Sequence, residues 1–285
     1  MKEKIALMTD TVANLPESFI KENNIYVISL YVVVDEKYYK DGIDITPEDM
    51  FRLNDEDPSF SSKSASPSPD DFSKIFKQIK DDGYEKVIFI GMGSNLSSTI
   101  INSNIAEHHG LEVATIDSKT VTILEGLIVM YANDLLNSGA DFDTIVKKLN
   151  KAVGNSIAIG WINSLRYLKA GGRLGKAASK VSAVLNFKPF MSVDGNGEFD
   201  LYKLKISKEK SYIETVKKVK EELAGKENYY MAYLYGNDIS ILDGVKSDLA
   251  DLEKNAKGVF EAPTGSVVAV HVGPKIYAVA YLLID

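Results

Sequence analysis

Hydroxyl side chains follow a short apolar run in the stretch VIFIGMGSNLSST, residues 87–99. The run ends in Gly91-Met92-Gly93, and the hydroxyl residues after it are Ser94, Ser97, Ser98 and Thr99. A strand, a tight turn and a helix start of this kind would present backbone N–H groups and the positive end of a helix dipole to an anion. The same serines could also serve as the N-cap of the helix, which is the simpler interpretation.

Three nucleotide-binding and nucleophile motifs do not fit this stretch. A dinucleotide fingerprint would need a third glycine where Leu96 stands. A phosphate loop would need Gly-Lys followed by Ser or Thr, and a nucleophile turn would need G-x-S-x-G. The stretch therefore indicates either an anion site of another kind or a capped helix.

Arg173 and His271 are the residues of the second half that could complete such a site. Arg173 follows Gly171-Gly172, and its planar guanidinium suits a carboxylate or a phosphate, although a salt bridge is the plain alternative. His271 ends an apolar run, where it could bind a ligand or simply be packed and hydrogen-bonded. The chain has no cysteine and no His-x-x-x-His pair. We therefore expect no metal site built from Cys or His and no thiolate chemistry.

Aspartates that end or border the expected strands open a second possibility. They are Asp10, Asp41, Asp44 and Asp117. Carboxylates gathered at one sheet edge could bind Mg²⁺ for a phosphotransferase or a hydrolase. In a related alternative, Ser94 or Ser97 would pair with His271 as nucleophile and base. Strand-end aspartates also cap the helices that follow them, and capping is the simpler interpretation.

The first half of the chain alternates between expected strands and helices. Lys4–Thr9, Lys86–Ile90 and Glu112–Ile116 are apolar runs typical of strands in a buried parallel sheet. The amphipathic pattern of Asp70–Asp82 and the largely apolar Thr122–Asn137 predict helices. This alternation predicts a parallel sheet covered by helices on both faces.

The second half mixes hairpins with helices. Asn196-Gly197 predicts a β-hairpin between Lys188–Val193 and Phe199–Leu204. We also expect Ser266–His271 and Ile276–Ile284 to be strands joined by a hairpin-like loop.

These patterns together predict an α/β protein of two domains divided near residue 155. Residues 1–155 would hold the parallel sheet with its flanking helices. Residues 156–285 would hold a second α/β unit with a mixed sheet, hairpins and a helix over Ala177–Leu185.

Composition limits the partners of the chain. Its 285 residues carry a formal net charge of −7, and repulsion from phosphate backbones leads us to expect no nucleic-acid partner. No apolar stretch approaches the length of a membrane span, and the N-terminus lacks the apolar core of a signal peptide. We expect a cytoplasmic protein with no integral membrane association and no bound cofactor.

Seven motifs, in order along the chain, resemble those of the DegV family of fatty-acid-binding proteins. They are Thr9–Pro16 (TDTVANLP), Tyr39–Asp44 (YKDGID), Ser64–Pro69 (SASPSP), Ser94–Thr99 (SNLSST), Leu168–Gly175 (LKAGGRLG), Asn186–Pro189 (NFKP) and His271–Pro274 (HVGP). Each motif alone is weakly specific, but their shared order from residue 9 to residue 274 is specific. The chain departs from the family at Ser64, where the family has Thr, and at Lys275, where it has Gly.

The resemblance implies a bacterial protein that binds a long-chain fatty acid between two domains and is not itself an enzyme. It implies that the bound acid is presented to a separate fatty acid kinase, which phosphorylates the carboxyl group. By the same resemblance, the residues that bind the carboxyl would be Ser64, Ser94, Ser97 and His271. Arg173 would face the carboxyl or the acyl phosphate.

Overall fold

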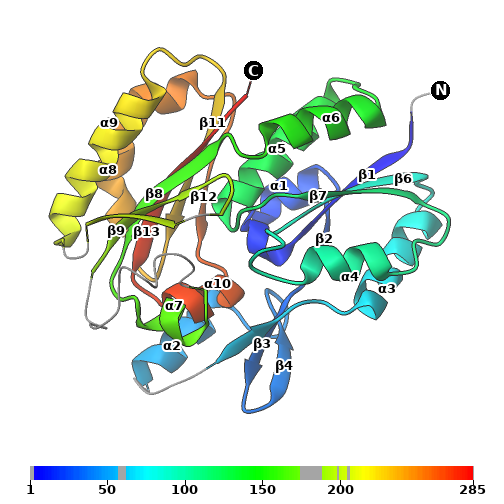
Figure 1. The fold of residues 1–285 in the computed structure, drawn as a ribbon, viewed down its shortest axis with the longest axis horizontal. Helices are drawn as coiled ribbons and strands as arrows, with labels where there is room; N and C mark the ends of the chain where they lie inside the picture. Colours follow the sequence, from blue (N-terminus) through cyan, green and yellow to red (C-terminus); the bar gives the residue numbers. More distant parts are fainter. Residues whose placement is uncertain (1–2, 57–61, 174–187, 198, 204–205, 285) are drawn as a thin grey trace.

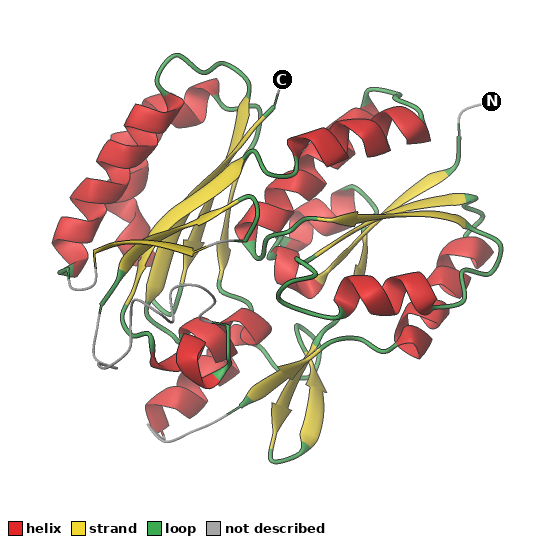
Figure 2. Ribbon diagram, in the orientation of Figure 1, coloured by secondary structure: helices red, strands yellow, loops and turns green. Residues whose placement is uncertain are grey.

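The computed structural model describes residues 3–56, 62–173, 188–197, 199–203 and 206–284. A parallel sheet and a mixed sheet form its centre, with a small third sheet beside them (Figures 1 and 2). The predicted α/β fold class is thereby confirmed. The helix expected over Ala177–Leu185 lies outside the described residues.

The first sheet has the strand order β2-β1-β6-β7, and its neighbouring strands pair in parallel. Its strands are β1 (Ile5–Asp10), β2 (Tyr26–Ile28), β6 (Lys86–Gly91) and β7 (Glu112–Asp117). Successive side chains of β1 point to opposite faces, so Ile5 and Leu7 pack in one layer while Ala6 and Met8 pack in the other. Burial on both faces explains the continuous apolar run of this strand.

Helices cover both faces of this sheet, as the alternation of strand and helix predicts. One face packs against α3 (Pro69–Asp81) and α4 (Thr99–Ile105). The other packs against α5 (Ile123–Asn137) and α6 (Phe142–Ala152). Two short elements follow β1, a 3₁₀ turn η1 (Thr11–Ala13) and helix α1 (Glu17–Glu22).

The second sheet is mixed and has the strand order β10-β9-β8-β13-β11-β12. Its strands are β8 (Ser156–Ile162), β9 (Phe190–Asp194), β10 (Phe199–Lys203), β11 (Tyr229–Tyr235), β12 (Val259–Pro263) and β13 (Ile276–Leu283). Strands β11 and β12 pair in parallel, and the other neighbours pair antiparallel. The hairpin predicted around Asn196-Gly197 is confirmed as β9 and β10.

The outer face of the mixed sheet is covered by α8 (Lys208–Leu223) and α9 (Leu242–Asn255) (Figure 1). The 3₁₀ turn η3 (Ile239–Ile241) leads into α9. The inner face of the sheet turns toward α5 and the first sheet.

Helix α5 lies between the two large sheets and contacts strands of both (Figure 1). Eleven of its fifteen residues are buried, because a helix packed between two sheets needs an apolar surface over most of its circumference. Glu125 is a buried exception, and its Oε1 accepts a hydrogen bond from Thr9 Oγ1 over 3.2 Å. Burial raises the pKa of Glu125 well above its usual value, and the negative charge of Asp10 adds to the shift.

A small antiparallel sheet with the order β4-β3-β5 lies beside the large ones. Its strands are β3 (Tyr31–Val34), β4 (Lys37–Lys40) and β5 (Lys63–Ala65). Together with α2 (Pro47–Glu56), this sheet packs against a short helix from near the end of the chain, α10 (Ser266–Val272). Helix α7 (Arg166–Ala170) contacts the same helix.

The prediction of a strand over Ser266–His271 is wrong, because this segment forms helix α10. Its valines are β-branched and favour a strand by propensity, but the segment is buried almost completely against four neighbouring elements. These tertiary contacts outweigh the local preference. Strand β13 forms as predicted, yet it pairs with β8 and β11 rather than with residues 266–271.

The mixed sheet begins at Ser156, next to the predicted division at residue 155. However, α10 comes from the second half of the chain and packs against α2, β3 and β5 of the first half. The two-domain boundary therefore stays a prediction.

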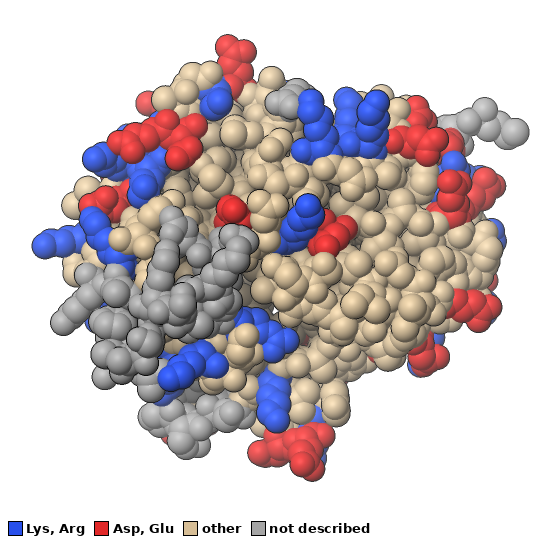
Figure 3. Space-filling view, viewed as in Figure 1, with Lys and Arg blue, Asp and Glu red and all other residues tan. Residues whose placement is uncertain are grey.

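On the face drawn in Figure 3, acidic and basic side chains of the described residues occur in small separate groups. Within the described ranges, no helix is both long and apolar enough to cross a bilayer.

Candidate functional site

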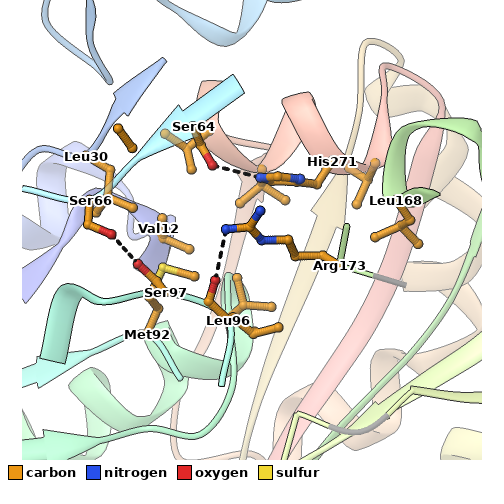
Figure 4. Close-up of a pocket in the computed structure, with 15 residues that line it drawn as sticks. Val12, Leu30, Ser64, Ser66, Met92, Leu96, Ser97, Leu168, Arg173 and His271 are labelled. Carbon is orange, nitrogen blue, oxygen red and sulfur yellow. Dashed lines mark hydrogen bonds between the residues drawn. The ribbon is translucent and has the colours of Figure 1, made fainter. Parts of the chain in front are cut away.

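A cavity of about 80 Å³ lies at the carboxyl ends of β1 and β6 (Figure 4). The strand order reverses between these two strands, and in open α/β sheets ligands bind at such a switch point. Its apolar lining consists of Val12, Leu30, Ala65, Met92, Leu96, Val121, Leu168, Val267, Val268 and Val272. Its polar lining consists of Ser64, Ser66, Ser97, Arg173 and His271. We call this space the polar cavity.

His271 of α10 and Ser64 of β5 meet in the polar cavity, with His271 Nε2 2.9 Å from Ser64 Oγ (Figure 4). Burial lowers the pKa of His271 to about 4, and the positive charge of Arg173 adds to this effect. The imidazole is therefore neutral near pH 7.

The surroundings of Nδ1, the other ring nitrogen of His271, indicate which of the two nitrogens carries the proton. Nδ1 is buried without a hydrogen-bond partner among the described residues, and Gly171 packs so closely that a Cβ there would lie 2.1 Å from it. Unpaired buried N–H groups are rarer in proteins than unpaired acceptors, so we assign the ring proton to Nε2, which then donates to Ser64 Oγ. The hydroxyl proton of Ser64 is then free to be donated to an anion.

A chain of hydroxyls forms the opposite wall of the polar cavity. Ser98 donates to Ser66 over 3.0 Å, Ser66 and Ser97 lie 2.7 Å apart, and Ser97 lies 2.8 Å from Thr99. Asn102 fixes this wall to the loop after β5 by donating to the carbonyl of Pro67 over 2.7 Å. The motifs at residues 64–69 and 94–99, which are distant in sequence, thus form one hydroxyl-lined surface.

Arg173 lies at the exposed edge of the polar cavity. Its guanidinium donates to the carbonyl of Gly171 over 2.6 Å and to the carbonyl of Leu96 over 3.4 Å. It therefore connects the loop after α7 to the hydroxyl loop after β6 (Figure 4). Both acceptors are neutral carbonyls, so the cationic group could exchange them for an anion.

Ser94 lies apart from the other predicted site residues. Its backbone N–H and its hydroxyl both donate to the carboxylate of Asp117, over 3.1 and 2.6 Å, and it does not line the polar cavity. The structure brings together Ser64, Ser97, Arg173 and His271. A contact between Ser94 and a bound carboxyl stays a prediction, and it would require Ser94 to leave Asp117.

Each of the four aspartates accepts a backbone N–H, but of the four only Asp10 caps the helical turn that follows it, η1, as the capping interpretation predicts. Asp10 accepts from Val12 over 2.8 Å and from Met92 over 3.0 Å. Asp41 accepts from Ser266, Asp44 from Lys40, and Asp117 from Ser94 and Lys119. In the part of the chain that the structure describes, no three His, Asp or Glu side chains converge as metal ligands would.

A second cavity, of about 90 Å³, adjoins the polar one on the inner face of the mixed sheet. The two spaces share the lining residues Val121, Leu168, Val268 and Val272. Small residues of neighbouring strands, Ala158, Gly160 and Ala278, help to form its wall. The lining is almost entirely apolar, so we call this space the apolar cavity.

Sequence reasoning missed the apolar cavity and the part played by Ser66. The small residues of β8 and β13 were the available signal, because small side chains on a strand face leave room beside the sheet. Ser66 stands in the same motif as Ser64. Only the tertiary contacts show that Ser64 meets His271 and that Ser66 meets Ser97.

Two neighbouring cavities, one lined by hydroxyls and one apolar, define an α/β protein with a polar and an apolar space side by side. The chain belongs to the DegV family, since the family model described as an uncharacterised protein of the DegV family matches residues 4–283. The resemblance inferred from the seven motifs is thereby confirmed.

Relatives and solved structures agree with this assignment. A DegV domain-containing protein of Clostridium acetobutylicum is 30% identical over 98% of this chain and 99% of its own length. The fold matches a DegV family protein of Thermus thermophilus, described as fatty-acid binding, with a TM-score of 0.87 at 22% identity over 99% of this chain and 100% of that one. A stearic acid-binding protein of Eubacterium ventriosum matches with a TM-score of 0.87 at 24% identity over 99% and 98% of the two chains.

Proposed function

We propose that this protein binds a long-chain fatty acid, with the carboxyl in the polar cavity and the tail in the apolar cavity. The observation that carries the proposal is that a hydroxyl-lined cavity and an apolar cavity lie next to each other and share four lining residues. The fatty-acid-binding descriptions of the solved relatives support the same ligand class.

The tail would supply most of the binding free energy. Burial of about 0.8 kcal/mol per CH₂ gives a sixteen-carbon chain on the order of 12 kcal/mol before the cost of immobilising it. The polar cavity would supply orientation. A buried carboxylate needs hydrogen-bond donors, and the free hydroxyl proton of Ser64 together with the Ser66–Ser97 pair offers them.

Presentation of the acid to a separate fatty acid kinase is the second part of the proposal. A carboxyl beside Ser64 would lie near Arg173, whose side chain is exposed to solvent at the cavity edge. Phosphorylation there would add negative charge next to a guanidinium whose hydrogen bonds, within the described part of the chain, go to two neutral carbonyls. The cytoplasmic location expected from the sequence belongs to the same proposal, because a kinase draws on ATP.

The enzyme alternatives receive less support from the same geometry. Ser64, rather than Ser94 or Ser97, pairs with His271. A catalytic base is normally oriented by a third group, whereas Nδ1 of His271 faces Gly171 without a partner among the described residues. The aspartates of the magnesium alternative are already engaged by backbone N–H groups. We therefore propose a non-catalytic carrier.

The test combines lipid extraction with a variant that fills the apolar cavity. Mass spectrometry of lipid extracted from the purified protein should reveal a fatty acid, and oleate should raise the melting temperature. Ala278→Leu adds three carbons to the wall of the apolar cavity and should weaken oleate binding more than decanoate binding. Stabilisation by magnesium and nucleotide but not by oleate would contradict the proposal.

The carrier role needs its own measurement. Oleate-loaded protein mixed with a bacterial fatty acid kinase and ATP should yield acyl phosphate, trapped as a hydroxamate. Loaded protein that stays unphosphorylated with every such kinase tested would contradict presentation but not binding.

A further inference from the structure

Asp41 lies outside both cavities, yet its backbone and its carboxyl contact several segments of the polar cavity's wall. The residue is buried, with 3% of its surface exposed. Its Oδ1 accepts the backbone N–H of Ser266, the first residue of α10, over 3.1 Å. Its own N–H donates to the carbonyl of Leu30, a lining residue, over 2.9 Å.

Helix α10 depends on this contact because its own sequence offers little support. The residue before it, Gly265, has no side chain to cap it, and the first N–H groups of a helix need partners. The helix has seven residues, four of them valines. A helix this short and this rich in β-branched residues is not stable alone. A cap supplied from a distant loop is therefore a substantial part of what holds it.

The loop around Asp41 is built to hold the start of α10. Ser266 Oγ donates to the carbonyl of Ile45 over 3.2 Å, and that same carbonyl accepts the N–H of Gly42. Burial raises the pKa of Asp41, while hydrogen bonds from Ser266, Thr11 and Val267 oppose the rise. The carboxyl thus collects donors from two helix residues and from η1.

The far end of α10 carries the imidazole of the polar cavity. His271 lies in the last turn of the helix, and Val267, Val268 and Val272 of the same helix line the cavity. A seven-residue helix moves as one body, so the contact at Ser266 sets where His271 meets Ser64. Thr11 Oγ1 also accepts the N–H of Leu30 over 3.2 Å, which extends the same network to the opposite wall.

We propose that Asp41 is a positioning residue of the polar cavity. It caps the start of α10 from a distant loop of the same chain, and it thereby holds His271 against Ser64. Asp41 does not touch the bound acid. It acts through the helix, so its loss should alter the imidazole's surroundings as well as ligand loading. The loading part of this inference rests on the proposed function, and the imidazole part does not.

The experiment compares Asp41→Ala with Asp44→Ala and with the milder Asp41→Asn. Asp44 stands in the same loop but is exposed, and its carboxylate accepts the N–H of Lys40 rather than that of Ser266. The first measurement is an NMR titration of the His271 ring in the ligand-free protein, with the signal assigned by His271→Gln. The second is oleate loading of each variant.

We expect Asp41→Ala to move the titration of His271 toward its ordinary pH range, because the ring gains access to water. Loading should fall about three- to thirtyfold, the range that a lost cap implies. Asp44→Ala should match the wild type in both measurements. An Asp41→Ala protein with an unchanged His271 titration would overturn the inference, as would an equal effect of Asp44→Ala.

If Asp41→Ala does not fold, Asp41→Asn decides the question. Its amide keeps one acceptor oxygen and loses the other, so a smaller shift of His271 in the same direction is expected. A wild-type titration of His271 in that variant would overturn the inference. Failure of the wild type to load oleate would contradict the proposed function alone, since the imidazole measurement needs no ligand.

Discussion

His271 Nε2 lies 2.9 Å from Ser64 Oγ, so a helix from the end of the chain and a strand from its first quarter meet at one hydrogen bond. Sequence separates the two residues by 207 positions. The bond joins the small sheet to α10 at the polar cavity. Substitution of Ser64 should change ligand affinity, and substitution of His271 should change how stability depends on pH.

Ser64→Ala should weaken oleate binding about tenfold, because it removes a hydroxyl that can donate to the carboxylate. A hydrogen bond to a charged group contributes more than one between neutral groups. Ser64→Thr keeps the hydroxyl and should bind within about threefold of the wild type. Calorimetric titration with oleate measures both. Equal binding by the alanine and threonine variants would show that this hydroxyl does not contact the carboxyl.

Ser97→Ala should reduce oleate binding more than Ser94→Ala does. Ser97 lines the polar cavity and bonds to Ser66, whereas Ser94 is held by Asp117 outside it. The expected loss for Ser97 is about three- to tenfold, the range for one neutral hydrogen bond. The same titration compares the two matched variants. A larger loss for Ser94→Ala would instead place Ser94 in the ligand-bound site.

Arg173→Gln should raise the pKa of His271 while leaving it below its ordinary value of 6.5. Burial is the larger cause of the lowered pKa, and the Arg173 charge is the smaller one, so removing the charge relieves only part of the shift. Arg173→Lys keeps the charge and serves as the control. An NMR titration of the ring measures the change, and an unchanged pKa in Arg173→Gln would contradict this electrostatic assignment.

Asp10 and His271 should affect stability in opposite directions as the pH changes. Burial raises the pKa of Asp10 from 3.8 to about 7, with the charge of Asp41 adding to it. The contribution of Asp10 to the free energy of unfolding is therefore full below pH 3.8 and is lost as the pH rises through 7. The pKa of His271 is lowered from 6.5 to about 4, so its contribution is present above pH 6.5 and is lost as the pH falls through 4.

The two residues can be separated by urea unfolding at a series of pH values. Asp10→Asn should lose stability more steeply than the wild type as the pH falls below 6.5. In the wild type, protonation of Asp10 offsets part of the stability that is lost when His271 becomes charged, and the variant lacks this offset. His271→Gln should remove a dependence of up to about 3 kcal/mol over the same range. Buried Glu125 acts in the same direction as Asp10. Identical pH profiles for both variants and the wild type would contradict the assignment.

Local patterns in the sequence were sufficient to predict much of the fold. Apolar runs predicted β6 and β7, apolar periodicity predicted α3, and Asn196-Gly197 predicted the turn between β9 and β10. Helix α10 could not be predicted in this way, because its cap comes from Asp41, 225 positions away. The valines of that segment favour a strand until this distant contact is known.

The candidate site was predicted by the order of its motifs rather than by physics. Ser64, Ser97 and His271 line one cavity, but the direction of the Ser94 side chain depends on Asp117, the last residue of the neighbouring strand β7. The apolar cavity depends on which faces of β8 and β13 meet α5 and α10. That arrangement follows from tertiary packing and leaves only weak local signals in the sequence.

Helix α5 gives both halves of the molecule a shared interior, and this has a consequence for folding. A fragment that stopped at residue 155 would expose to water the flank of α5 that β8, β11 and β13 now cover. Separation would expose apolar surface on α5 and on the mixed sheet at the same time. We therefore expect neither half to unfold independently of the other. Heating the intact chain should give a single cooperative transition, with the two large sheets unravelling together.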